Sequence, residues 1–116
     1  MTSSLPPPDE YCPFHPDTKM EGQDYWENSM AFVCPHQHYW YERRKDLSPN
    51  LAIYQYQDDV FDLTYDQYLG DNTMSIVIFT GGVGYQTITD DKPCHSKEEF
   101  IEYCKSGMYK VLALFM

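Results

Sequence analysis

Alternating apolar and polar positions in the middle of the chain predict two neighbouring β-strands. Over residues 51–56 the even-numbered positions are Ala and two Tyr, so one face of an extended segment is apolar. Residues 61–65 repeat this period of two, with Phe, Leu and Tyr at the odd-numbered positions. Asp58 and Asp59 lie between the segments and are typical of a turn. The pattern therefore predicts two paired strands.

Residues 64–70 also admit a second interpretation. Thr64 followed by Gln67 has the spacing of a capping box, which would begin a short helix. Gly70 would then end that helix. The sequence leaves open whether the second strand continues here or gives way to a helix.

The next segment has the composition of a strand inside a sheet. Residues 74–80 are apolar on both faces, which favours a central strand over an edge strand. Gly81 and Gly82 follow, and tight hairpin turns need the positive φ that glycine adopts readily. We therefore predict a hairpin whose second strand spans residues 83–89.

A helix is predicted after residue 95. Ser96 is a suitable N-cap, Glu99 is its reciprocal partner in a capping box, and Gly107 supplies a stop. The predicted buried face comprises Phe100, Ile101 and Cys104.

The C-terminal residues 109–116 are almost wholly apolar, so we expect them to be buried as a strand beside residues 74–80. Together these elements predict an α+β fold. We expect an N-terminal segment packed on a small, mostly antiparallel sheet with one main C-terminal helix. Residues 1–10 are proline-rich and predict a flexible arm. Residues 11–116 then form a single compact domain, made of a segment over 11–45 and an α+β core over 51–116.

Composition and charge narrow the function classes. The chain has 116 residues, 16% of them aromatic, and a formal net charge of -10. This acidity disfavours binding to phosphate backbones, and it either attracts a partner protein with a basic surface or only maintains solubility. The first residues lack a signal peptide and no apolar stretch has the length of a membrane span. We therefore expect an intracellular protein of the cytoplasm or nucleus, in which cysteines serve as metal ligands or buried thiols.

Two short motifs predict a metal site. The first is Cys12-Pro13-Phe14-His15 and the second is Cys34-Pro35-His36-Gln37-His38. Each places a histidine three or four positions after a cysteine, across a turn shaped by proline. Such turns present two ligands to one ion, and the 18 residues between His15 and Cys34 allow them to meet around a tetrahedral Zn²⁺. The alternative is that both cysteines are ordinary buried thiols.

The flanking residues extend this pattern. Residues 31–33 predict a strand that enters the second turn, and residues 39–41 predict a strand that leaves it. Over residues 11–45 the layout resembles a zinc ribbon, which implies a structural zinc. That family commonly has a cysteine three positions after the first in each turn, where this chain has His15 and Gln37.

This departure leaves the fourth ligand to be chosen between two histidines of the second turn. His38 is preferred because its longer gap from Cys34 lets it curl back towards the ion. His36 is the alternative.

Cys94, His95 and Cys104 form a second group. A cysteine near a helix N-terminus can be reactive, because its pKa can be lowered there. A helix would separate the two cysteines by about 12 Å, beyond disulfide reach. We therefore expect Cys104 to be a core residue and Cys94 to have no special role.

Three functions from different classes follow. We favour a non-enzymatic, zinc-stabilised module that binds or masks a basic protein in a regulatory role. Its aromatic anchors would be Trp26, Tyr39, Trp40 and Tyr41. The first alternative is a zinc-dependent hydrolase. Its candidate bases are Glu10, Asp17 and Glu42. The second is nucleic-acid binding through residues 39–45, where aromatic residues precede a basic cluster.

Overall fold

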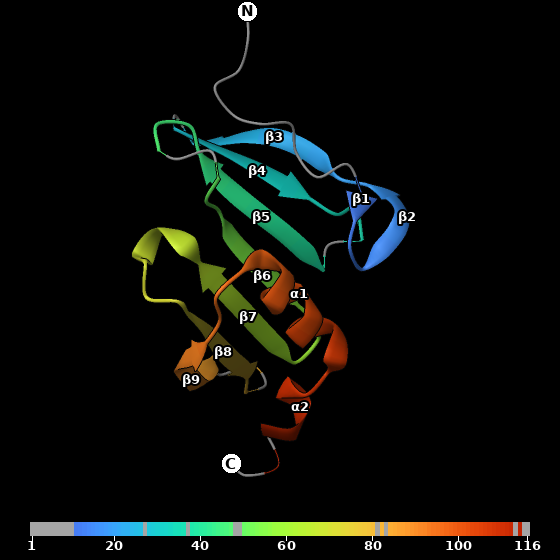
Figure 1. Ribbon diagram of the computed structural model, residues 1–116. Helices are drawn as coiled ribbons and strands as arrows, with labels where there is room; N and C mark the ends of the chain where they lie inside the picture. The colour runs from blue at the N-terminus through green and yellow to red at the C-terminus, as the bar shows by residue number, and fades with distance from the viewer. Residues whose placement is uncertain are drawn as a thin grey trace, which may run out of the picture.

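A seven-stranded antiparallel sheet forms the frame of the computed structural model, and each of its strands pairs with the next one along the chain (Figure 1). Its strands are β3 (Glu21–Trp26), β4 (Ser29–Val33), β5 (Tyr39–Arg44), β6 (Ile53–Gln57), β7 (Phe61–Asp66), β8 (Thr73–Phe79) and β9 (Tyr85–Pro93). A separate two-stranded sheet joins β1 (Tyr11–Cys12) to β2 (His15–Lys19). The helices are α1 (Lys97–Ser106) and α2 (Tyr109–Leu112).

The structure describes residues 11–26, 28–36, 38–47, 50–80, 82, 84–112 and 114, with the backbone alone over 23–26. The flexible arm predicted over residues 1–10 lies outside this range. The prediction of an α+β fold with a mostly antiparallel sheet and one main C-terminal helix is confirmed.

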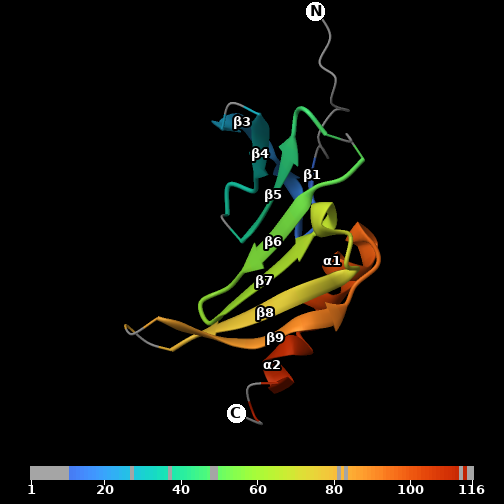
Figure 2. The same ribbon diagram turned by 90° about the vertical axis from the view of Figure 1, so that its left-hand side faces the viewer.

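The predicted hairpins are present. Strands β6 and β7 pair across a turn in which the Asp58 carboxylate accepts hydrogen bonds from the backbone N–H groups of Val60 and Phe61, at 2.8 and 2.7 Å. Strands β8 and β9 form the second hairpin, and Gly82 in its turn has a φ of 60°. Figure 2 shows this hairpin extending beyond the body of the sheet.

Both elements considered over residues 64–70 are present, since the strand continues and a short helix follows it. Strand β7 continues to Asp66, whose side chain accepts a hydrogen bond from the N–H of Tyr68 at 2.9 Å. Asp66, rather than Thr64, therefore caps the short 3₁₀ helix Gln67–Leu69. Gly70 ends that helix with a φ of 73°.

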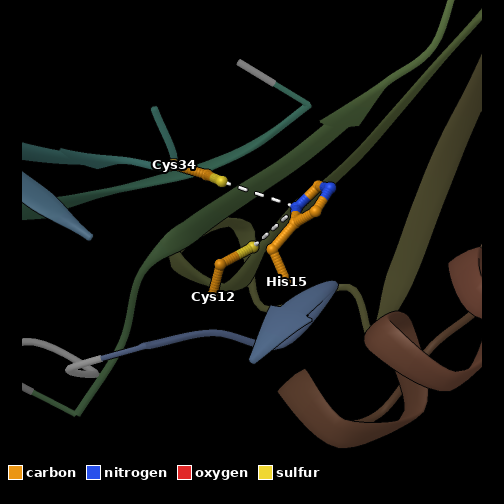
Figure 3. Close-up of side chains that lie close together, drawn as sticks. All are labelled: Cys12, His15 and Cys34. Carbon is orange, nitrogen blue, oxygen red and sulfur yellow. Dashed lines mark hydrogen bonds between the residues drawn. The ribbon is translucent and has the colours of Figure 1, made fainter. Parts of the chain in front are cut away.

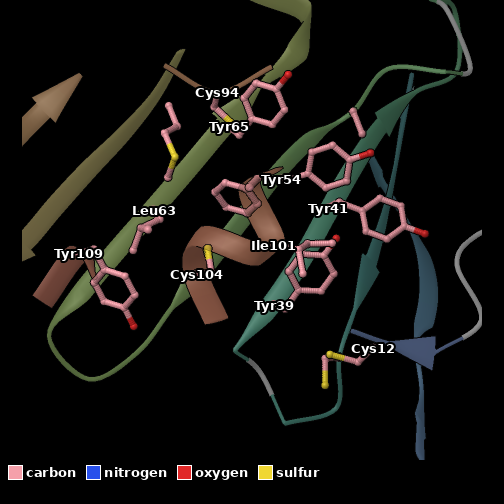
Figure 4. Close-up of a cluster of buried hydrophobic side chains, with 14 of the residues drawn as sticks. Cys12, Tyr39, Tyr41, Tyr54, Leu63, Tyr65, Cys94, Ile101, Cys104 and Tyr109 are labelled. Atoms are coloured by element: carbon pink, nitrogen blue, oxygen red, sulfur yellow. The ribbon is translucent and has the colours of Figure 1, made fainter. Parts of the chain in front are cut away.

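A row of aromatic rings crosses the covered face of the sheet. Phe32, Tyr41, Tyr54 and Tyr65 are register partners on four successive strands, with ring centroids 5.0, 5.7 and 6.2 Å apart. Helix α1 adds Phe100, whose ring lies 6.4 Å from Tyr54 and 6.1 Å from Tyr65. Figure 4 shows the tyrosines of this row side by side. Directly opposed aromatic side chains stabilise neighbouring strands and fix their register.

Both helices lie on the same face of the sheet (Figures 1 and 2). Helix α1 begins as predicted, since the Ser96 hydroxyl accepts a hydrogen bond from the N–H of Glu99 at 3.0 Å. It ends at Gly107, which has a φ of 70°. Its buried residues are those predicted from the sequence: Phe100, Ile101 and Cys104. Within the described residues no helix is long and apolar enough to cross a lipid bilayer.

The prediction of a C-terminal strand is wrong. Residues 109–112 form α2, and β8 is already paired with β7 on one edge and β9 on the other. Because no edge of β8 is free, a further strand has no place beside it. Among the described residues of this run Tyr109 is buried as expected, whereas Val111 and Leu114 are 49% and 78% exposed.

The segment over residues 11–45 was expected to pack on the sheet, but most of it forms part of the sheet. Strands β3, β4 and β5 do not pack on the sheet but extend it, because β5 pairs with β6. Only the β1–β2 hairpin packs on the face. Its Phe14 ring lies 5.2 Å from Tyr39 and 4.6 Å from Tyr56, on the same side of the sheet as the helices.

The Phe100→Ala substitution should lower the free energy of unfolding by about 3 to 5 kcal/mol, because it leaves a cavity between α1 and the aromatic row. Urea denaturation followed by circular dichroism measures the change. The matched control is Glu102→Ala, an exposed position of the same helix, which should shift stability by less than about 0.5 kcal/mol. Equal shifts for the two variants would show that α1 is not anchored through Phe100.

Candidate metal site

Two hairpin turns build the candidate site. Cys12 ends β1 and His15 begins β2, so the two residues face each other across the first turn. The backbone N–H of Phe14 donates to the Cys12 Sγ at 3.4 Å. In the second turn the N–H of Cys34 donates to the carbonyl oxygen of Tyr39 at 3.0 Å, which closes the link between β4 and β5. The strands predicted on both sides of the second turn are therefore confirmed.

The turns bring three donor atoms together (Figure 3). The Nδ1 of His15 lies 3.8 Å from the Cys12 Sγ and 3.6 Å from the Cys34 Sγ. All three donor atoms lie within 4.8 Å of one another. Tetrahedral zinc, with Zn–S near 2.3 Å and Zn–N near 2.0 Å, separates a sulfur from a nitrogen by about 3.5 Å. The spacing of these side chains therefore suits a metal ion.

Desolvation shifts the pKa values of two members of the cluster, Cys12 and His15. The Cys12 and Cys34 side chains are fully buried. Burial raises the pKa of the Cys12 thiol to about 11. Desolvation lowers the pKa of His15, and the neighbouring His36 and His38 lower it further. His15 is thus held neutral, which is the form that binds a metal, whereas the Cys12 thiol must lose its proton on binding.

The two candidates for the fourth ligand lie beside the cluster but outside it. The His36 ring stacks on His15 with centroids 4.1 Å apart, and its Nε2 lies 3.2 Å from the Thr18 Oγ1. The His38 ring is 5.8 Å from His15, and its Nδ1 lies 3.3 Å from the carbonyl oxygen of Gln57. The structure thus gathers three of the four predicted ligands and places His38 next to them. The contact with Gln57 was not predicted, since no local pattern marks a backbone acceptor 19 residues away.

The second cysteine group has no sign of reactivity. Cys94 and Cys104 are buried free thiols, and burial raises the pKa of both. The pKa of Cys94 reaches about 11, so the lowering considered for a cysteine near a helix N-terminus does not occur. Cys104 is a core residue, as predicted. His95 is exposed.

The structure corrects two of the predicted aromatic anchors. Tyr39 and Tyr41 are fully buried, and burial raises the pKa of both hydroxyls. They belong to the core and cannot contact a partner. Because side chains alternate along β5, Trp40 points to the face opposite the helices, where it is half-buried. For Trp26 the structure describes the backbone alone.

The basic cluster after the aromatic residues does not form one surface. Arg43 is buried, with its guanidinium 5.3 Å from the centre of the Tyr41 ring. The Arg44 guanidinium lies 5.1 Å from the centre of the Tyr68 ring. Strand alternation turns these two side chains to opposite faces of β5. The arrangement argues against a nucleic-acid groove over residues 39–45.

The carboxylates considered as catalytic bases do not join the metal cluster. The group of His, Cys, Asp and Glu side chains gathered in the described part of the chain consists of Cys12, His15 and Cys34 alone. Asp17 and Glu42 are outside that group, and Glu10 lies outside the described residues.

No protein-family model matches the chain, and no curated protein or solved structure resembles it significantly. Any assignment of function therefore depends on the geometry of the site itself.

The affinity of this site for a metal ion such as Zn²⁺ should increase with pH. Because the Cys12 thiol, with a pKa of about 11, is protonated at neutral pH, binding of the metal releases at least one proton. The apparent affinity should then increase at least about tenfold per pH unit between about pH 6.5 and 8. A competition titration against a chromophoric chelator measures this slope. Cys12→Ser should reduce the slope as well as the affinity, and a pH-independent affinity would exclude binding through this thiol.

Proposed function

We propose that the chain is a small acidic module in which Zn²⁺ joins the two turns and whose role is to bind another protein rather than to catalyse a reaction. The observation that supports this most directly is the spacing of the Cys12, His15 and Cys34 donor atoms, which suits tetrahedral zinc. Two thiolates among the ligands favour zinc over the harder cations that prefer oxygen.

His38 is the better candidate for the fourth ligand. Two imidazoles on one tetrahedral zinc have ring centres about 5 Å apart. The His15–His38 separation of 5.8 Å is closer to this value than the His15–His36 separation of 4.1 Å. The contact between the Nδ1 of His38 and the Gln57 carbonyl would also hold its Nε2 free for the metal. Such a hydrogen bond commonly fixes the tautomer and orientation of a histidine ligand.

A closed site with four protein ligands is structural, because it leaves no position for a water molecule. It would tie the β1–β2 hairpin to the sheet, and the resemblance to a zinc ribbon fits this role. The zinc-dependent hydrolase is the alternative, because only three donor atoms lie within the cluster. It requires an open zinc position and a nearby carboxylate base. The absence of Asp and Glu from the described cluster makes it the weaker proposal.

Charge and exposure support a protein partner. The chain has eighteen acidic and eight basic side chains, so its association with a basic surface would be fast and salt-dependent. Of the predicted anchors whose side chains are described, Trp40 alone lies on the face of the sheet opposite the helices. Register places it beside Val33 on one neighbouring strand and Gln55 on the other. A tryptophan in a mixed apolar and polar setting suits the centre of an interface.

Elemental analysis of protein purified without added metal should find one zinc per chain. The double variant Cys12→Ser, Cys34→Ser should lose it, because oxygen ligands replace both thiolates. The control is the pair Cys94→Ser, Cys104→Ser, which changes two cysteines outside the site and should retain the zinc in the fraction that folds. No metal in folded wild-type protein would refute the zinc assignment.

The same preparations test the ligand set. His38→Ala should weaken zinc binding by at least about tenfold, whereas His36→Ala should change it only slightly. The reverse order would make His36 the ligand. If neither substitution changes the affinity and a solvent-derived ligand is found on the metal, the site is open and the hydrolase becomes the better proposal.

Trp40→Ala should weaken binding to the protein partner by about tenfold or more, because interface tryptophans contribute heavily to affinity. The measurement is pulldown from a cell lysate followed by titration of the captured protein. The matched control is Tyr85→Ala, which removes an aromatic ring that is 70% exposed on β9. Retention of every captured protein by the Trp40 variant would count against an interface on this face.

A further inference from the structure

A cleft lies between the β1–β2 hairpin and the two helices. Its volume is about 610 Å³, which is within the range of small-molecule sites. Pro13, Phe14 and Pro16 line it from the hairpin, and Lys105, Gly107 and Lys110 line it from the helical side. The cleft also borders the metal site, because His15 and His38 are among its lining residues.

One wall of the cleft is aromatic. The Phe14 ring stacks on Tyr56 with centroids 4.6 Å apart and an interplanar angle of 28°. The Tyr109 ring meets Tyr56 edge-on at 6.4 Å. All three residues line the cleft, and Phe14 and Tyr56 are only partly buried. This wall offers a surface against which a planar ring can stack.

The charge of the cleft is opposite to that of the chain as a whole. Lys105 and Lys110 are two of only eight basic side chains, and both are exposed. The carboxylate that lines the cleft with them, Asp58, already accepts hydrogen bonds from two backbone N–H groups and from the Tyr109 hydroxyl at 2.9 Å. Burial raises the pKa of Asp58, but these donors and the positive charge of the nearby Lys110 outweigh burial and hold it below its ordinary value.

The metal site adds no charge to this balance. A Zn²⁺ held by two thiolates and two neutral imidazoles is neutral overall. The charged groups that line the cleft are then two lysines and one carboxylate, and most of the hydrogen-bonding capacity of that carboxylate is already used. The cleft is therefore a locally positive and partly apolar site in an acidic protein.

We propose that this cleft binds a small aromatic anion, with its ring against the Phe14–Tyr56 wall and its anionic group between Lys105 and Lys110. This goes beyond the proposed function, since it assigns a small-molecule ligand to a surface separate from Trp40. The two sites lie on opposite faces of the sheet, because Tyr56 points to the covered face and Trp40 to the other. A ligand and a protein partner could therefore bind at the same time.

Phenyl phosphate is a probe that combines both features, and inorganic phosphate and phenol each carry one of them. Isothermal titration calorimetry of the zinc-loaded protein should show saturable binding of phenyl phosphate, tighter than that of either fragment. Lys105→Gln and Lys110→Gln should each weaken it about tenfold, the usual effect of losing one hydrogen bond to a charged group. The matched control is Lys45→Gln. Lys45 follows the last residue of β5, whereas His38 precedes its first residue, so this lysine lies at the other end of the strand from the cleft.

Three outcomes would overturn the proposal: no saturable binding of phenyl phosphate, equal binding of inorganic phosphate, or equal loss of affinity in the Lys45 variant. Because Lys105 and Lys110 are exposed, their substitution should leave the far-ultraviolet circular dichroism unchanged. The zinc content of each sample is measured alongside. A cleft that fails to bind while zinc is retained leaves the metal assignment intact, and loss of zinc in wild-type protein identifies failure of the metal site instead.

Discussion

The row of aromatic rings across the sheet is the interaction on which the other parts depend. Phe32, Tyr41, Tyr54 and Tyr65 face one another on successive strands, and a slip of one residue in any pairing would turn a ring to the opposite face. The row also forms the surface on which α1 packs through Phe100. The β1–β2 hairpin packs beside it, on the next pair of tyrosines. The positions of the metal site and of the cleft are thus both set by the register of the sheet.

Local signals explain why much of the fold was predictable. The period of two in β6 and β7, the glycines before β9 and the N-cap at Ser96 each determine structure within a few residues. The prediction of a C-terminal strand over residues 109–116 was wrong, because the apolar character of this segment indicates only that some of it is buried. Whether it forms a strand depends on a free sheet edge, and β9 already occupies the edge of β8.

The candidate site was predictable to a similar extent. Each Cys-Pro turn is local, and three of the predicted ligands meet as expected. Two of the four aromatic anchors, Tyr39 and Tyr41, are buried, because alternation along β5 places them together on the covered face and Trp40 on the other. The cleft could not be predicted, since Phe14, Tyr56 and Lys105 come from three distant segments that only the packing of the hairpin and α1 brings together.

The pairing of β1 and β2 has a consequence for motion. These strands hydrogen-bond to each other in a two-stranded ladder of their own and not to the seven-stranded sheet. Two-stranded ladders have little stability in isolation. The amide protons of β2 should therefore exchange with solvent through local detachment of the hairpin, and more slowly if a metal ion occupies the candidate site, while those of β7 exchange only when the whole sheet opens.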